Sequence, residues 1–228
     1  MTCDNSQDQE IQALNRRIRE FTTPLVALHQ LLNLIQQSSD PKDLGKWITP
    51  IKTNNRRLLE SMGNVLFCSS GENLIPIPMT SINLEKLIED ICSELIPDAK
   101  SKSLNLILDI RTSTDKDKWV SGNYKYLNQA IRNLIDNAIK FTQAGTVTIT
   151  FSVSTNGERI ITISDTGCGI KAEIQNQIFD RYRPHLSSGG LGLYVARAIA
   201  QQHGGSINLL ESSKEGSTFE FKLPSSKV

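Results

Sequence analysis

The sequence has few cysteines, no long apolar run and no excess of charge of either sign. Its cysteines are widely separated and form no CxxC pair, a distribution that favours neither a zinc site nor a disulfide framework: Cys3, Cys68, Cys92 and Cys168. No apolar run approaches the roughly 20 residues that cross a bilayer. Residues 1–12 are polar and acidic, unlike a signal peptide. We therefore expect a cytoplasmic protein with no membrane insertion by this chain.

The 25 basic and 24 acidic residues almost balance. Nucleic-acid-binding domains and lipid-binding surfaces carry a clustered basic excess, so neither class is expected. Hydrophobic residues make up 38% of the 228 residues and charged residues 21%. This composition supports a packed core, and the length accommodates one ordinary domain and a smaller element.

Two series of apolar residues, spaced alternately by three and four, fill residues 8–69. The first is Ile11, Leu14, Ile18, Phe21, Leu25, Leu28, Leu32 and Ile35, and the second is Leu44, Ile48, Ile51, Asn55, Leu58, Met62 and Val65. Such a repeat predicts two helices with coiled-coil seams, joined at the Asp40-Pro41 break. One antiparallel hairpin cannot shield both seams, whereas two copies can form a dimeric four-helix bundle. We expect a homodimer, with a heterodimer with a related hairpin as the alternative.

Pro24 lies inside the first predicted helix. An interior proline removes a hydrogen bond, kinks the helix and costs about 3 kcal/mol. We therefore interpret Pro24 as the mark of a functional site.

Residues 70–82 read as a linker, and residues 83–226 predict a second domain. Asn83 is placed to cap a helix with apolar residues on one face, and Asn156-Gly157 predicts a hairpin turn. The other expected elements are strands at 104–110, 147–153, 159–164, 207–211 and 218–223 and helices at 124–141 and 193–203. This pattern predicts a two-layer α/β sandwich, so the whole chain is of the α+β class.

The helix expected at 124–141 has a polar stripe formed by Asn133, Asp136, Asn137 and Lys140. Amide oxygens suit a magnesium ion and an ammonium group suits phosphate, so the stripe is compatible with a magnesium triphosphate. For this helix alone, a solvated face is the simpler interpretation.

Two glycine-rich segments favour a nucleotide site over a solvated helix face. A predicted strand ends in Asp165, followed by Gly167 and Gly169; the carboxylate can accept a base amino group while the glycines allow close backbone approach. Gly190 and Gly192 then lead into a helix whose free N–H groups can meet phosphate. Together with the polar stripe, they predict an ATP site.

Here the sequence resembles the sensor histidine kinases. Residues 133–142 are similar to their N box, 165–169 to the first glycine box, 178–183 to the F box and 190–193 to the second glycine box. Residues 203–224 follow the family's ending, and the hairpin resembles its dimerisation and phosphotransfer domain. The ATPase motifs are shared with type II topoisomerases and some chaperones; the hairpin selects the kinase branch.

The resemblance implies a role for each matching residue. Asn137 would bind Mg²⁺, and Asn133 and Lys140 would meet the phosphates of ATP. Asp165 would read the adenine amino group, with Gly167 and Gly169 shaping its pocket. Gly190 and Gly192 would bracket the triphosphate. Ser188 replaces a glycine that the family usually has, and the segment between Arg183 and Gly189 is short, so we expect either altered nucleotide exchange or weaker nucleotide binding.

The chief departure is at the phosphoacceptor. The family motif reads His-Glu-x-x-Thr-Pro, and this chain reads Arg19-Glu20-Phe21-Thr22-Thr23-Pro24. A guanidinium stays protonated and offers only donors, so Arg19 cannot accept a phosphoryl group. His29 is ten residues further on, about 15 Å along the helix and rotated by about 80°, which is too far to replace it. We expect no self-phosphorylation at the usual position.

Glu20 and Thr23 keep the arrangement that, in this family, orients a water molecule to dephosphorylate a receiver domain. The resemblance therefore implies a response-regulator phosphatase, or a protein that phosphorylates the histidine of a partner kinase. Both residues are equally compatible with ordinary surface positions. The alternatives are a non-catalytic module whose conformation is set by nucleotide, and a protein kinase with a non-histidine acceptor.

Overall fold

The computed structural model describes residues 22–23, 25–35, 47–48, 50–51, 54–55, 58, 62–64, 78–180 and 191–225. The chain divides into two units, residues 1–73 with 181–191 and residues 74–180 with 192–228. Among the described residues, no helix is long and apolar enough to cross a membrane.

The described residues between 22 and 64 are helical. Four of them that belong to the predicted seams have exposed side chains, namely Leu25, Leu32, Ile48 and Met62. Arg19, Glu20 and Pro24 lie outside the described residues. The antiparallel hairpin and the four-helix bundle therefore stay predictions.

The second unit is built on a five-stranded sheet in the order β2-β4-β5-β7-β6. β2 pairs with β4 in parallel and the other pairs are antiparallel. A separate antiparallel ribbon pairs β1 with β3. The strands are β1 (Thr80–Asn83), β2 (Leu104–Arg111), β3 (Trp119–Gly122), β4 (Gly145–Val153), β5 (Arg159–Asp165), β6 (Ser206–Ser213) and β7 (Gly216–Leu223).

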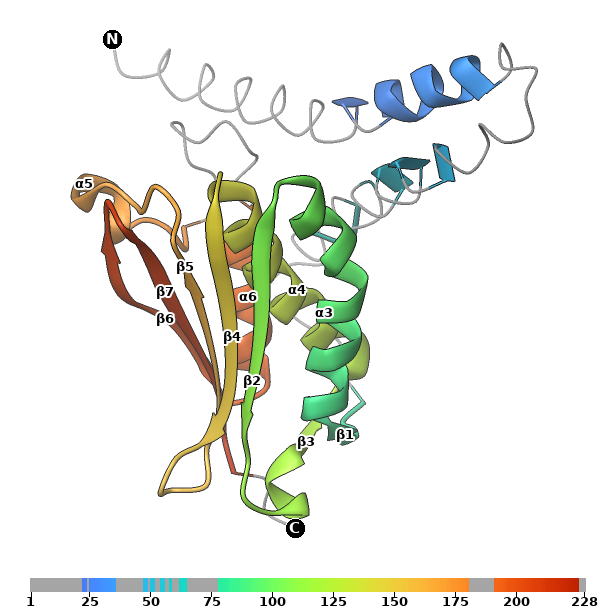
Figure 1. Cartoon of the computed structure of the whole chain (residues 1–228). Coiled ribbons are helices and arrows are strands. Elements are labelled where there is room, and N and C mark those ends of the chain that lie inside the picture. The colour runs from blue at the N-terminus through green and yellow to red at the C-terminus, as the bar shows by residue number, and fades with distance from the viewer. Residues whose placement is uncertain are drawn as a thin grey trace, which may run out of the picture. The chain divides into compact units, whose positions relative to one another are not determined.

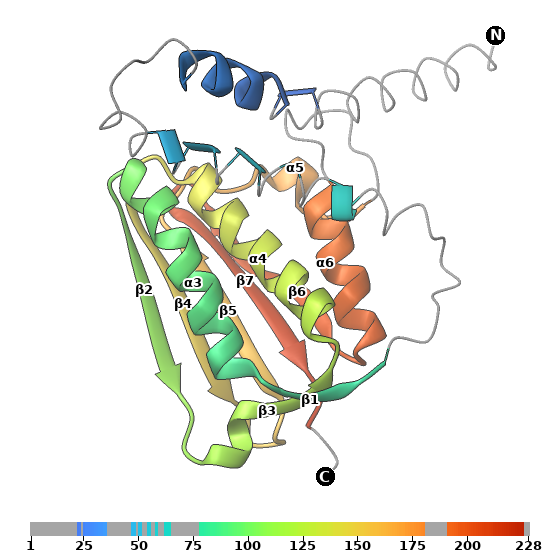
Figure 2. The same cartoon turned by 90° about the vertical axis from the view of Figure 1, so that its right-hand side faces the viewer.

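Three helices, α3 (Leu84–Ser101), α4 (Tyr124–Phe141) and α6 (Leu191–Gln202), lie on one face of this sheet, as Figure 1 and Figure 2 show. The strands turn alternate residues towards the helices, so Val147, Ile149 and Phe151 of β4 are fully buried. Two short helices complete the unit, η2 (Asp115–Lys118) and α5 (Ala172–Gln175). The mixed α+β class expected from the sequence is confirmed.

Polar side chains fix where the long helices begin. The Asn83 side chain accepts a hydrogen bond from the Lys86 amide at 3.0 Å and caps α3. Asn123 does the same for α4 through the Tyr126 amide at 3.3 Å. Gly157, at φ +79°, lies in the turn between β4 and β5. The predicted Asn83 cap and the predicted hairpin turn are confirmed.

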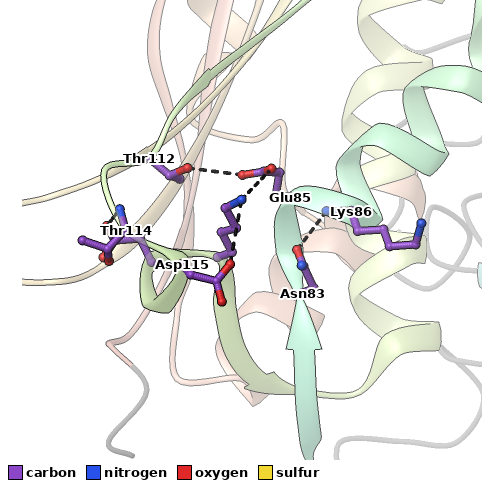
Figure 3. Close-up of polar contacts among 8 residues, drawn as sticks. Asn83, Glu85, Lys86, Thr112, Thr114 and Asp115 are labelled. Carbon is purple, nitrogen blue, oxygen red and sulfur yellow. Dashed lines mark hydrogen bonds and ion pairs between the residues drawn. The ribbon is translucent and has the colours of Figure 1, made fainter.

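A polar cluster ties the start of α3 to the connection between β2 and β3 (Figure 3). Glu85 accepts a hydrogen bond from Thr112 Oγ1 at 3.2 Å and pairs with Lys118 at 3.1 Å. Nearby, the buried Arg159 donates to backbone carbonyls of η2 and of the β4–β5 turn. These contacts satisfy the charges locally, and we assign them a structural role.

Candidate functional site

Helix α4 carries the polar stripe and is anchored by its opposite face. The apolar residues of that face are almost completely buried: Leu127, Ile131, Leu134, Ile135 and Ala138. Along the stripe, exposure rises from Asn133, which is buried, through the half-buried Asn137 to the exposed Lys140. The stripe is therefore only partly a solvated face.

At the buried end of the stripe, α4 meets the start of α6. The Asn133 side-chain amide donates a hydrogen bond to the Gly192 carbonyl at 3.1 Å. A Cβ at Gly192 would lie 3.6 Å from Asn133 Cγ, which is ordinary van der Waals contact. The second glycine segment thus begins its helix directly against Asn133. Gly190 lies outside the described residues.

Asp165 is the last residue of β5 and is half-buried. Its Oδ1 accepts a hydrogen bond from the Gly167 amide at 2.8 Å, and its strand pairs it with Ser217 of β7. Burial raises the pKa of the Asp165 carboxyl, and hydrogen bonds from the backbone amides of Gly167 and Ser217 oppose that rise. The result is a fixed, partly desolvated acceptor at the end of a strand.

The segment after Asp165 is packed so closely that side chains are excluded. A Cβ at Gly167 would lie 2.6 Å from the Phe141 carbonyl oxygen, at the end of α4. Gly169 has φ +65°, and a Cβ there would lie 1.6 Å from the Ser213 carbonyl oxygen. Both positions therefore require glycine.

The two glycine segments meet the two ends of the same stripe. Gly192 contacts Asn133, and Gly167 contacts the backbone of Phe141, next to Lys140. These groups come from distant parts of the sequence, yet α4 gathers them along roughly 10 Å of helix, the rise of seven residues. The end near Phe141 offers the Asp165 carboxylate as an acceptor. The end near Gly192 offers the Asn133 amide and the start of α6. This arrangement suits a ligand that has a base at one end and an anionic tail at the other.

Thr23 is helical and exposed. Glu20 is not among the described residues, so the predicted arrangement of Glu20 and Thr23 stays a prediction.

His203 is buried, and its Nε2 accepts a hydrogen bond from the Asn123 amide at 3.0 Å. Its Nδ1 lies 2.7 Å from the Ile199 carbonyl oxygen. Both ring nitrogens contact backbone groups, so we assign His203 a structural role.

Several groups that shape the site were given no role there from the sequence. Ser217 contributes through its backbone amide, and the Ser212 hydroxyl accepts a hydrogen bond from the Ile170 amide at 2.8 Å. Gly216 has φ +136°, and a Cβ there would lie 1.8 Å from the Asp165 carbonyl oxygen. Gly216 itself is the one sign of this turn in the sequence, because a glycine marks a position where a left-handed backbone is possible. Serines beside a turn are too common to indicate a role.

The second unit of the chain is similar to known ATPase domains. Residues 122–227 match the family described as histidine kinase-, DNA gyrase B-, and HSP90-like ATPase. The chain is 33% identical over 205 residues to the heme sensor protein HssS of Staphylococcus saprophyticus. The aligned region covers 88% of this chain and 43% of that protein. The chain therefore spans less than half the length of the HssS relatives it matches.

Solved structures share the fold. Full-length ShkA in complex with AMPPNP matches with a TM-score of 0.66 at 21% identity, over 95% of this chain and 46% of that one. Histidine kinase ThkA in complex with the response regulator protein TrrA matches with a TM-score of 0.61 at 22% identity, over 93% of this chain and 61% of that one. At these identities the likeness concerns the fold alone.

Proposed function

We propose that this chain carries the ATPase core of a sensor histidine kinase and that it is an ATP-binding transmitter component of a two-component pathway that lacks its own phosphoacceptor histidine. It acts on a partner, either by dephosphorylating a response-regulator receiver domain or by phosphorylating the histidine of a partner kinase. The observation that carries the proposal is the meeting of both glycine segments with the α4 stripe.

The described residues suit ATP at each part of the ligand. Asp165 is a half-buried acceptor for the adenine amino group. Gly167 and Gly169 let the segment after it pack against the backbone of Phe141 and Ser213, which fixes this wall of the proposed pocket. Asn133 and Lys140 would meet the phosphates from the stripe. Gly192 is the second residue of α6, and the N–H groups at the start of this helix favour an anion.

Mg²⁺ would be held by the side-chain oxygen of Asn137, together with phosphate oxygens and water, the ligand set that this ion prefers. Bound there, it would neutralise phosphate charge. Lys140 is exposed on the same stripe and adds a positive charge.

Glu20 and Thr23 are the residues proposed to act on a phosphorylated receiver. A carboxylate and a hydroxyl one helical turn apart can hold a water molecule for in-line attack on the phosphoryl group. The attack releases inorganic phosphate and leaves the receiver carboxylate free. Thr23 is exposed on its helix, as this role requires. ThkA has been solved with a response regulator, which supports a receiver as partner.

The exposed seam residues of the first unit support a dimer, formed with a second copy or with a related kinase. Leu25 is 49% exposed and Leu32 is 51% exposed. Large apolar side chains repeated on one helix stripe are covered by another helix in stable proteins. A four-helix bundle of two hairpins would cover them.

A second candidate function is a non-catalytic module in which nucleotide only sets conformation. Arg19 favours it, since this side chain removes the usual phosphoacceptor. Under this hypothesis the chain binds ATP but changes the phosphorylation of no partner.

A receiver dephosphorylation assay separates the two. Purified receiver domains, phosphorylated chemically, are incubated with the full chain and Mg-ATP, and inorganic phosphate release is followed. We expect faster release with the parent and with Thr22→Ala, a matched change at the neighbouring exposed threonine, but not with Thr23→Ala. ATP binding without any effect on receivers or partner histidines would favour the module.

A further inference from the structure

Lys102 follows the last residue of α3 and reaches the end of a different helix. Its backbone forms the C-cap of α3, and the next residue, Ser103, has φ +57°. Among the residues that the structure describes, Ser103 is the one non-glycine residue in the left-handed region. This turn ends α3 and places the Lys102 side chain against α4.

The Lys102 ammonium satisfies the last carbonyls of α4. Its Nζ donates to the Ile139 carbonyl oxygen at 2.7 Å and to the Lys140 carbonyl oxygen at 2.8 Å. The preceding carbonyl, of Ala138, accepts from the Thr142 amide at 3.1 Å and from its hydroxyl at 2.7 Å. The end of α4 is therefore fixed by named donors rather than left to fray.

This helix end is also where the candidate site is assembled. The Phe141 carbonyl oxygen lies against Gly167, and the Lys140 side chain lies over the Phe141 ring, with Nζ 5.5 Å from the ring centroid. A displacement of residues 139–141 would move the Lys140 side chain and the wall of the pocket together. A cation at a helix C-terminus is moreover favoured by the helix dipole.

The geometry points to Lys102 as a positioning residue for the nucleotide site: it holds the end of α4 so that Lys140 meets the phosphates. This role rests on the proposed ATP site and names a residue outside the family motifs. Lys102 touches backbone, so it acts through Lys140 and not on the ligand.

ATP affinity of the full chain, measured by calorimetry with Mg²⁺, tests the assignment. Lys102→Met keeps the aliphatic length but cannot donate, and we expect ATP to bind about tenfold more weakly, which is within the range by which residues of one hydrogen-bond network are coupled. Lys102→Arg restores donors for both carbonyls and should recover most of the affinity. Lys100→Met, an exposed lysine on the same turn, should bind ATP as the parent does.

A double-mutant cycle with Lys140→Ala separates positioning from a general loss of stability. In the Lys140→Ala background, adding Lys102→Met should weaken ATP binding by less than about twofold, because residues in one network are not additive. Additive losses, or unchanged affinity in a folded Lys102→Met, would overturn the assignment while leaving ATP binding intact. If Lys102→Met does not fold, Lys102→Ala, which also lacks a donor, takes its place. A parent chain that binds no ATP would overturn the proposed function itself.

Discussion

At the scale of the single residue, Asp165 combines a strand-end position with a fixed orientation. The Gly167 amide holds Oδ1 at 2.8 Å, and burial keeps water from much of the carboxylate. A carboxylate held in this way accepts from an amino group more strongly than a mobile surface carboxylate, because the cost of ordering it has been met on folding.

The substitution Asp165→Asn should weaken ATP binding by about 1.5–3 kcal/mol, or roughly ten- to a hundredfold. The asparagine side-chain oxygen can keep the hydrogen bond from the Gly167 amide. Its NH₂ group then faces the adenine amino group, and because both groups are donors, no hydrogen bond forms between them. Calorimetry with Mg-ATP measures the change. Asp109→Asn, on the edge strand β2, serves as the control. Equal affinity in parent and Asp165→Asn would remove Asp165 from the pocket.

His203 is held neutral by its surroundings. Burial lowers its pKa below the ordinary value, and the hydrogen bond to Ile199 partly opposes this. The unfolded imidazole takes up a proton near pH 6.5, whereas the folded one does so only at lower pH. Between the two values the unfolded state binds more protons, so stability falls as pH falls.

We therefore expect the free energy of unfolding of the parent to drop between about pH 7.5 and pH 5.5. His203→Gln, which does not titrate, should lose less stability over that window, although it starts from a lower value. Urea unfolding at several pH values gives the free energy of unfolding of each protein and its change with pH. His29→Gln, at an exposed position, should follow the parent. Parallel curves for parent and His203→Gln would show that His203 does not contribute.

At the scale of the element, long periodic segments were predictable and short ones were not. The bounds expected for the helix from Tyr124 to Phe141 are those of α4, because its apolar face repeats over five turns. The four-residue strands β1 and β3 were missed. Their pairing is set by partners about 40 residues apart in sequence, and Pro76 and Pro78 made the region read as a linker.

The site was predictable where side chains carry it. Asn133, Asp165 and the glycines were found because their types are unusual at those positions. The contributions of the Phe141 carbonyl and the Ser217 amide were not, since every residue has a backbone. Lys102 lies at a helix end, where a lysine is common and indicates nothing by itself.

The hairpin gives the element-scale prediction. If two copies bury the seam of residues 25, 28, 32 and 35, then Leu32→Glu places a charge in the interface. Burying an unpaired charge costs several kcal/mol, which would raise the dimer dissociation constant at least about a hundredfold. Leu34→Glu, at a position that is also exposed but lies off the seam, should stay dimeric.

Sedimentation of the full chain at micromolar concentration checks this expectation. Dissociation of both variants alike would mean that the seam is not the interface. A parent that sediments as a monomer would instead favour a heterodimer with a related kinase.

At the scale of the whole molecule, the chain combines a proposed ATP site of the histidine kinase type with a predicted first helix that has Arg19 at the position of the phosphoacceptor. Phosphoryl transfer depends mainly on positioning and on neutralising charge. Both contributions come from the ATPase domain. The expected lack of self-phosphorylation is therefore attributed to one side chain, Arg19, rather than to the nucleotide site.

Labelling with γ-phosphate-labelled ATP, applied to the parent and to Arg19→His, tests this claim most directly. The variant places an imidazole next to Glu20, so we predict acid-labile, histidine-linked phosphate on Arg19→His and none on the parent. An inert Arg19→His that still binds ATP would move the defect to Ser188 and the segment after Arg183 and favour the binding module. Acid-labile label on the parent would contradict the account and direct attention to His29.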